Sequence, residues 1–245
     1  MNTFPLIHAK NITYHHKQQH TIDNEPAIDD ITFSITQGEY IAIVGSNGSG
    51  KTTLARHLNA LHIPDSGEVL IEGRTTTQVK NRPFIHQTIG MIFQHPQEQL
   101  VATTVEEDVA FGLENLGIAT STIRSQVEKA LKQVSMWEYR FRPPQFLSAG
   151  QMQRVAIAGI LAMQPQCIIF DEASAMLDPL GRQDLLNLMK TLNQQGITII
   201  TITHFMEEAA CADRILALHE GKLRFDGKTS SFFADQVLLH EINLE

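Results

Sequence analysis

The chain has 245 residues, of which 42% are hydrophobic and 19% are charged, a composition typical of a packed globular protein. Its formal net charge of −8 at pH 7 argues against a nucleic-acid partner, because that surface would need clustered basic residues. No apolar run is long enough to span a bilayer, and residues 1–5 lack the pattern of a signal peptide. We therefore expect a cytosolic protein that reaches a membrane only through a partner.

The hydrophobic pattern predicts strands and helices that alternate along most of the chain. Apolar and polar residues alternate over 6–14 and 31–35, which predicts two half-buried strands with a polar, exposed excursion between them. An apolar strand over 40–44 leads into a glycine-rich loop and a helix over 52–61. Strands are then expected over 67–71, 89–93, 167–170, 197–201 and 214–218, and helical segments over 104–142, 148–162, 181–192 and 206–212.

This order of elements predicts an α/β fold, with a mainly parallel sheet and helices on its faces. An antiparallel β-subdomain is expected from the N-terminal strands. A helical lobe is expected as an insertion over about 95–162, where the strand pattern is lost. No linker divides the chain, so residues 1–245 are expected to form a single domain.

Residues 45–52 read Gly-Ser-Asn-Gly-Ser-Gly-Lys-Thr, the phosphate-binding pattern G-x-x-x-x-G-K-[ST] of a P-loop NTPase. Glycines let the backbone turn tightly, and its N–H groups together with the following helix N-terminus can hold the phosphates of ATP. Lys51 is expected to reach the β- and γ-phosphates, Thr52 to ligate Mg²⁺, and Thr53 to lie near a further phosphate. The residues expected to bind the nucleotide here are Gly45, Ser46, Asn47, Gly48, Ser49, Gly50, Lys51, Thr52 and Thr53.

Two acids end the apolar strand over 167–170. Asp171 is placed to hold Mg²⁺ through water, and Glu172 to polarise an attacking water. The alternative is that these acids only cap a following helix. That alternative explains poorly why both follow four apolar residues in a chain that also has a phosphate-binding loop.

Two further polar residues follow predicted strands. Gln94 follows the strand over 89–93 and could contact both Mg²⁺ and the attacking water. His204 follows the strand that begins at residue 197, where its imidazole could meet the γ-phosphate. Taken alone, each would be an ordinary turn or surface residue, and only the other motifs raise them to candidate catalytic residues.

With residues 147–151, Leu-Ser-Ala-Gly-Gln, these motifs make the whole chain resemble the nucleotide-binding subunit of ABC transporters. The matching motifs, in chain order, are the P-loop at 45–52, the Q-loop at Gln94, the signature at 147–151, the Walker B strand at 167–172, the D-loop at 174–178 and the switch histidine His204. The stretches 93–99, 107–115 and 155–162 narrow the resemblance to the ATPases of energy-coupling factor (ECF) transporters. The run 174–179 is most similar to the first of the two paralogous ATPases.

The resemblance implies the ABC ATPase fold and a head-to-tail dimer, homomeric or heteromeric, with ATP between the P-loop of one subunit and the signature of the other. Ser148, Gly150, Gln151 and Asp178 are then expected to complete the partner's nucleotide site. The implied partners are a second ABC ATPase, a transmembrane coupling subunit and a substrate-binding membrane subunit for a vitamin or metal ion. The chain would lie peripherally at the cytoplasmic face of the membrane.

Three positions depart from the family's pattern. Ala149 stands where the commonest signature has Gly, and its extra methyl is expected to leave activity intact. His16 stands where an aromatic residue usually stacks on adenine, with Tyr14 as the alternative. The chain ends at Glu245, earlier than related ATPases, so a C-terminal dimer-stabilising element is expected to be reduced.

Residues 96–117 contain five acids and no Lys or Arg: Glu98, Glu106, Glu107, Asp108 and Glu114. This run is either a solvated face or a docking surface for a basic coupling helix, and the implied groove favours docking.

Two other functions compete with a transporter ATPase. A soluble ABC ATPase on nucleic acid would need a long coiled coil or two cassettes, which the chain lacks, and a nucleotide-binding module without turnover would not need both Glu172 and His204.

Overall fold

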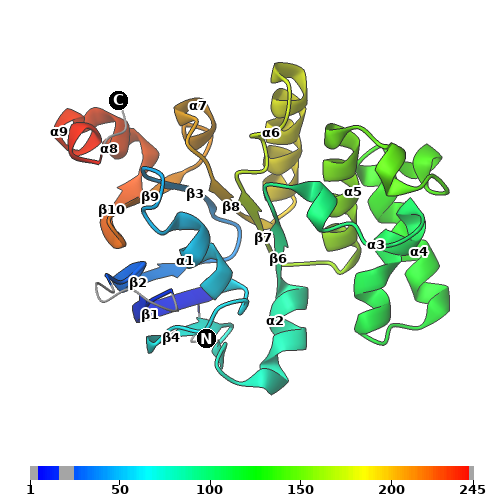
Figure 1. The fold of residues 1–245 in the computed structure, drawn as a ribbon, viewed down its shortest axis with the longest axis horizontal. Helices are drawn as coiled ribbons and strands as arrows, with labels where there is room; N and C mark the ends of the chain where they lie inside the picture. Colours follow the sequence, from blue (N-terminus) through cyan, green and yellow to red (C-terminus); the bar gives the residue numbers. More distant parts are fainter. Residues whose placement is uncertain (1–4, 17–24, 243–245) are drawn as a thin grey trace.

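The computed structural model describes residues 5–16 and 25–242. A six-stranded sheet in the order β10-β9-β3-β8-β7-β6 crosses the centre of the molecule (Figure 1). Neighbouring strands run parallel except β9 and β10, so the predicted mainly parallel sheet is confirmed. Its strands are β3 (Tyr40–Val44), β6 (Ile89–Ile92), β7 (Cys167–Asp171), β8 (Thr198–Ile202), β9 (Arg214–His219) and β10 (Lys222–Lys228).

The N-terminal strands form a separate antiparallel sheet in the order β2-β1-β4-β5, as predicted. It consists of β1 (Ile7–Tyr14), β2 (Ile28–Ile35), β4 (Ser66–Ile71) and β5 (Arg74–Thr75). Strand β2 begins earlier than predicted, because Ile28 and Ile31 are both fully buried and extend the apolar face of the strand. The other part of the predicted excursion, residues 17–24, lies outside the described residues.

Three helices, α3, α4 and α5, gather beyond the β6 edge of the central sheet (Figure 1). The segment predicted as helical over 104–142 therefore forms two helices followed by a 3₁₀ turn at 137–139. The α-helices among the described residues are α1 (Lys51–Leu58), α2 (Arg82–Thr88), α3 (Val105–Asn115), α4 (Thr120–Gln133), α5 (Ala149–Ala162), α6 (Pro179–Gln194), α7 (Met206–Ala209), α8 (Thr229–Ala234) and α9 (Gln236–Glu241).

The two faces of the central sheet pack into two different apolar cores. Alternate residues of one strand point to opposite faces, so Ala42 and Val44 of β3 join a core with the helices α3 to α6. Ile41 and Ile43 of the same strand join a core with α1 and the antiparallel sheet. The ends of β3, β7 and β8 are thus held rigidly between two packed layers.

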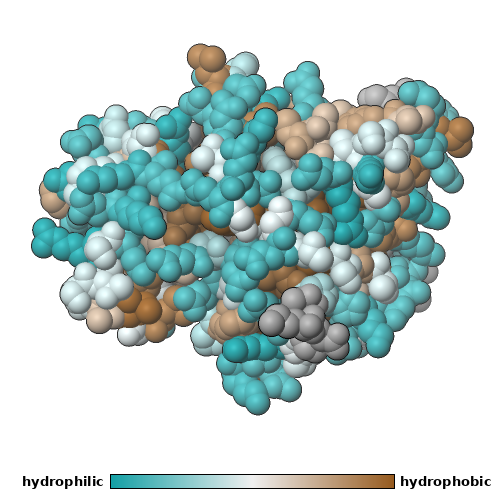
Figure 2. Space-filling view, turned by 180° about the vertical axis from the view of Figure 1, so that it is seen from behind, coloured by the Kyte–Doolittle hydropathy of each residue, from teal (hydrophilic) through white to brown (hydrophobic). Residues whose placement is uncertain are grey.

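The surface is mostly polar. Seen from the side opposite to Figure 1, apolar side chains appear in patches that are interrupted by polar ones (Figure 2). Within residues 5–16 and 25–242, no helix has the length and apolar character that crossing a membrane would require.

Candidate active site

The glycine-rich loop between β3 and α1 has a backbone that two of its glycines make possible. Gly45 and Gly50 have φ angles of 150° and 100°. A Cβ at Gly45 would lie 2.2 Å from the carbonyl oxygen of Leu218, and one at Gly50 would lie 2.4 Å from that of Ala27. Any side chain at either position would therefore displace the neighbouring backbone and distort the loop.

Lys51 begins α1 and lies against the inner side of this loop. Its side chain is buried, and Nζ donates hydrogen bonds of 2.9 Å and 3.0 Å to the carbonyl oxygens of Gly45 and Ser46. Burial lowers the pKa of Lys51, while the nearby carboxylates of Glu172 and Asp171 oppose that shift. The loop thus holds a desolvated ammonium group that an anion could neutralise.

Asp171 ends β7 directly beside the P-loop helix. Thr52 Oγ1 donates a hydrogen bond of 2.9 Å to Asp171 Oδ1. The carboxyl group is buried, and this burial raises its pKa, with the Thr52 hydrogen bond acting in the opposite direction. A buried carboxylate beside a hydroxyl is an oxygen donor set of the kind that hard divalent cations prefer.

Glu172 and His204 face each other from the ends of adjacent parallel strands, β7 and β8. The backbone N–H of Glu172 donates a hydrogen bond of 3.0 Å to the carbonyl oxygen of Ile202. The φ angle of Glu172 is 49°. The Glu172 Oε2 atom lies 3.9 Å from Nδ1 of His204. The structure thus brings together two of the predicted catalytic residues.

Two cavities open beside Thr52. Gln94 lines the first, of about 420 Å³, together with Thr52 and Asp171. His16 lines the second, of about 290 Å³, together with Thr52 and Glu172. Asn47, Gly48, Gly50, Lys51 and Thr53 also line the second cavity. The sequence-predicted P-loop, Walker B, Q-loop and adenine-side residues therefore surround one hydroxyl group.

His16 and Tyr14 differ in their surroundings. His16 Nε2 lies 3.2 Å from Thr53 Oγ1, at the edge of the P-loop cavity. Tyr14 instead stacks on the imidazole of His62, with ring centroids 5.2 Å apart, and meets His57 edge-on at 4.7 Å. Tyr14 is not among the residues that line the cavity.

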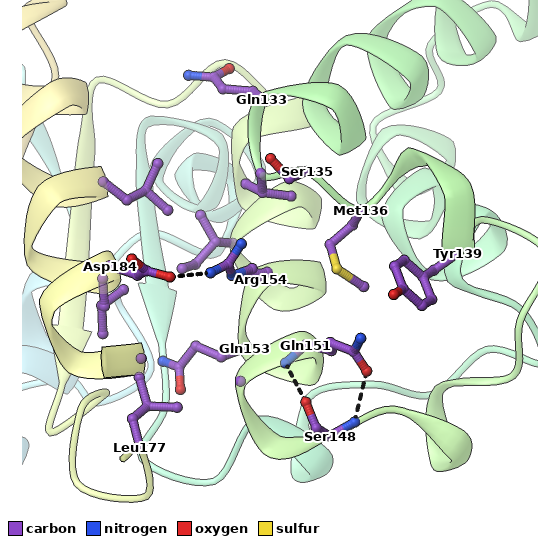
Figure 3. A pocket seen from close by; sticks show the side chains of 16 residues that line it. Gln133, Ser135, Met136, Tyr139, Ser148, Gln151, Gln153, Arg154, Leu177 and Asp184 are labelled. Atoms are coloured by element: carbon purple, nitrogen blue, oxygen red, sulfur yellow. Dashed lines mark hydrogen bonds and ion pairs between the residues drawn. The ribbon is translucent and has the colours of Figure 1, made fainter. Parts of the chain in front are cut away.

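The signature residues lie apart from these cavities. Ser148 caps α5, because its hydroxyl accepts from the Gln151 N–H at 3.3 Å and its own N–H donates to Gln151 Oε1 at 3.0 Å (Figure 3). Ser148, Gly150 and Gln151 line a separate cavity of about 520 Å³ between α5 and α6. Ala149 is exposed, so its methyl group meets solvent.

Asp178 has a structural contact of its own. It caps α6, where its carboxylate accepts from the Gly181 N–H at 2.8 Å. It does not line either cavity beside Thr52. Within one chain, the signature and Asp178 are therefore separated from the P-loop.

Sequence reasoning missed Arg56, which lines the Gln94 cavity and whose positive charge acts to lower the pKa of Asp171. It also missed Arg182, Phe205 and Glu208, which surround the loop that carries His204. Arg56 could have been found, because residues four apart on a helix share a face and Arg56 follows Thr52 at that spacing. Arg182 meets Phe205 and Glu208 only through the tertiary fold.

The family model described as ABC transporter matches residues 28–175. The chain is 50% identical over 241 residues to the energy-coupling factor transporter ATP-binding protein EcfA1 of Clostridium novyi, covering 98% of this chain and 86% of that protein. It is 44% identical to the corresponding protein EcfA of Methanosarcina acetivorans, covering 94% and 82% of the two chains.

Solved structures show the same relationship. One of cbiO1 from Clostridium perfringens, described as part of the ABC transporter complex cbiONQ, has a TM-score of 0.83 at 32% identity and covers 98% of this chain and 95% of that one. A dimeric ATP-binding cassette bound to ADP and Pi has a TM-score of 0.82 at 28% identity, covering 91% and 98%. The chain therefore belongs to the ABC transporter family of ATP-hydrolysing proteins, with the ABC ATPase fold, and the resemblance to the ECF ATPases is confirmed.

Proposed function

We propose that this chain is the ATPase subunit of an ECF-type importer, in which ATP-driven dimer closure powers uptake of a vitamin or metal ion. We infer that residues 1–245 act as one ATP-binding domain with a helical lobe over about 95–162. The observation that carries the proposal is the separation of two intact half-sites. The P-loop residues and the signature residues line two different cavities of the same chain. A second subunit would complete each site.

In this proposal each residue has a distinct task. Lys51 and the P-loop N–H groups bind the phosphates of ATP, and His16 stacks on the adenine. Glu172 orients the attacking water, and His204 contacts the γ-phosphate from the neighbouring strand. Ser148 and Gly150 contact the same phosphate from the partner subunit, with Gln151 and Asp178 supporting that interface.

Mg²⁺ fits this donor set. Thr52, Gln94 and Asp171 would hold it, and when bound it would offset the negative charge of the phosphates. In the described part of the chain, no group of three His, Cys, Asp or Glu side chains is arranged to hold a metal ion. Mg²⁺ commonly binds through one or two carboxylates together with substrate phosphates.

The proposed partners are a second ABC ATPase, identical or paralogous, a transmembrane coupling subunit and a substrate-binding membrane subunit. Through them the chain would lie at the cytoplasmic face of the membrane. An ATPase of another ABC transporter class, or a soluble ABC ATPase, is the alternative. Co-purification with a transmembrane subunit encoded by a neighbouring gene distinguishes the ECF-type ATPase from both alternatives. Neither alternative would assemble with an ECF coupling subunit.

Mixing two inactive variants tests the shared site. Lys51→Ala should weaken ATP binding in its own subunit, and Ser148→Ala should impair the site of its partner. Each variant alone carries two damaged sites, whereas a mixed dimer regains one site with both residues intact. We expect each variant to be nearly inactive and their mixture to recover part of the wild-type ATPase rate. If the wild-type chain is active by itself and the mixture recovers nothing, the two-subunit site is wrong.

A further inference from the structure

A buried carboxylate fixes the loop that carries His204. Thr203 Oγ1 donates a hydrogen bond of 2.7 Å to Glu208 Oε2, and the Phe205 N–H donates one of 3.0 Å to Thr203 Oγ1. Glu208 is only 2% exposed although it carries a carboxylate. The residues on both sides of His204 are thus tied, through one hydroxyl, to a single buried acid.

Arg182 of α6 contacts the same loop and the buried acid. Its Cζ atom lies 3.7 Å from the centroid of the Phe205 ring, and its Nε atom lies 3.6 Å from Glu208 Oε1. That separation is too long for a hydrogen bond, and neither atom has another hydrogen-bond partner within the described chain. Removing Arg182 would therefore take away the cation that faces the buried Glu208 carboxylate and leave it with the Thr203 hydrogen bond.

The Phe205 ring connects this ion pair to the imidazole. The ring centroids of Phe205 and His204 lie 4.1 Å apart, and His204 Nδ1 in turn lies 3.9 Å from Glu172 Oε2. Contacts therefore run without a break from the guanidinium of Arg182 to the carboxylate of Glu172. Arg182 itself lies one turn beyond Asp178, where the D-loop passes into α6.

We propose that Arg182 and Glu208 are positioning residues for His204. Glu208 fixes the backbone of the loop, and Arg182 holds the Phe205 ring against the imidazole. Because α6 begins at the D-loop, this arrangement makes the placement of His204 depend on the packing of that helix. This inference rests on the function proposed above, in which His204 acts on the γ-phosphate. Arg182 and Glu208 should therefore affect turnover and leave ATP binding nearly unchanged.

Steady-state kinetics of Arg182→Met provides the first test. The substitution keeps much of the side-chain volume and removes the cation, so kcat should fall about tenfold while KM for ATP changes little. Arg182→Lys keeps a cation near Phe205 and should recover part of that loss. Lys190→Met removes an exposed cation from the same helix and should behave as wild type. An increase in KM with unchanged kcat would contradict the proposal.

The imidazole NMR signal of His204 provides a test that does not depend on activity. The signal is identified by its absence in His204→Gln, and it should shift in Arg182→Met and Glu208→Gln but not in Lys190→Met. A His204 signal that stays in place in both variants overturns the proposal. If Arg182→Met does not fold, Phe205→Leu removes the ring between Arg182 and His204 and must lower kcat to a similar extent with little change in KM.

These measurements separate the inference from the function on which it rests. If His204→Gln hydrolyses ATP at the wild-type rate, His204 has no role in hydrolysis and that part of the proposed function fails. The response of the His204 signal to Arg182→Met still shows whether Arg182 positions it.

Discussion

The Thr52 hydroxyl donates a hydrogen bond to Asp171 across a sequence separation of 119 residues. This contact joins the P-loop to the Walker B strand and puts a hydroxyl and a carboxylate at the same point of the site. Burial raises the pKa of Asp171, which means that its charged form lacks full compensation within the chain. A divalent cation bound here would supply that compensation, so we infer that Mg²⁺ binding should favour the ionised carboxylate.

Glu172→Gln should bind ATP and hydrolyse it very slowly. The amide keeps the shape of the side chain but loses the charge that we propose orients the attacking water, and such general-base assistance contributes about 10²–10⁴-fold to a rate. The variant should also accumulate as an ATP-bound dimer, visible by size-exclusion chromatography. Glu128→Gln changes a carboxylate of α4 that pairs with Lys132 and should leave both properties unchanged. Turnover of Glu172→Gln near the wild-type rate would remove Glu172 from its proposed role.

His16→Ala should weaken ATP binding several-fold and leave the saturated hydrolysis rate almost unchanged. Stacking on a base contributes roughly 1–3 kcal/mol for a good aromatic platform, and imidazole is smaller than those rings. Inorganic triphosphate provides the matched control, because it has no base to stack. We expect calorimetry to show weaker binding of ATP alone, and an equal loss for both ligands would show that His16 acts on the phosphates.

Local patterns predicted the strand, loop and helix around Lys51, because the glycine spacing and the flanking apolar runs are all contiguous in the chain. They missed β10, whose burial alternates between exposed and intermediate without any buried residue, and the six-residue helices α8 and α9. A helix of one or two turns offers too few residues for a periodic pattern. The contact of Arg182 with Phe205 joins two segments that no local pattern connects.

Acid should destabilise the protein through His57, which lies in α1 beneath the P-loop. Its ring is fully buried, Nδ1 lies 2.7 Å from the Thr53 carbonyl oxygen, and burial lowers its pKa from 6.5 to about 4. Since the unfolded chain binds a proton below pH 6.5 and the folded chain does so only near pH 4, stability falls as the pH falls through that window. The loss should be roughly 2 kcal/mol between about pH 7 and pH 5.

Urea unfolding at both pH values checks this prediction, with His57→Gln as the comparison. The variant is expected to be less stable at neutral pH, because a buried imidazole is replaced, but it should lose less stability on acidification than wild type. An identical pH dependence in the two proteins would show that other groups cause the acid sensitivity.

The acidic run at 96–117 divides into groups with different contacts. Glu107 belongs to a capping box with Thr104 at the start of α3, and Asp108 Oδ1 accepts from the N–H groups of Val101 and Ala102. Reversing the charge of either would damage the fold. Glu106 and Glu114 line a cavity of about 380 Å³ that Glu107 also borders, together with Trp137, Phe141, Arg124 and Arg140. The sequence run lacks basic residues, but the fold places two arginines beside it.

Glu106→Lys combined with Glu114→Lys should uncouple the ATPase from the proposed transmembrane subunit. A basic coupling helix would be attracted to these acids, and the reversal would leave the cavity with four basic side chains that repel it. We expect ATPase activity of the isolated subunit to persist, while the amount of co-purified transmembrane subunit falls about tenfold or more at low salt. Glu220→Lys with Glu241→Lys makes the same charge change at two exposed residues that do not line this cavity, and it should assemble normally. Normal assembly of the first variant at low and moderate salt would make this a solvated face, and loss of its ATPase activity would point to a damaged fold.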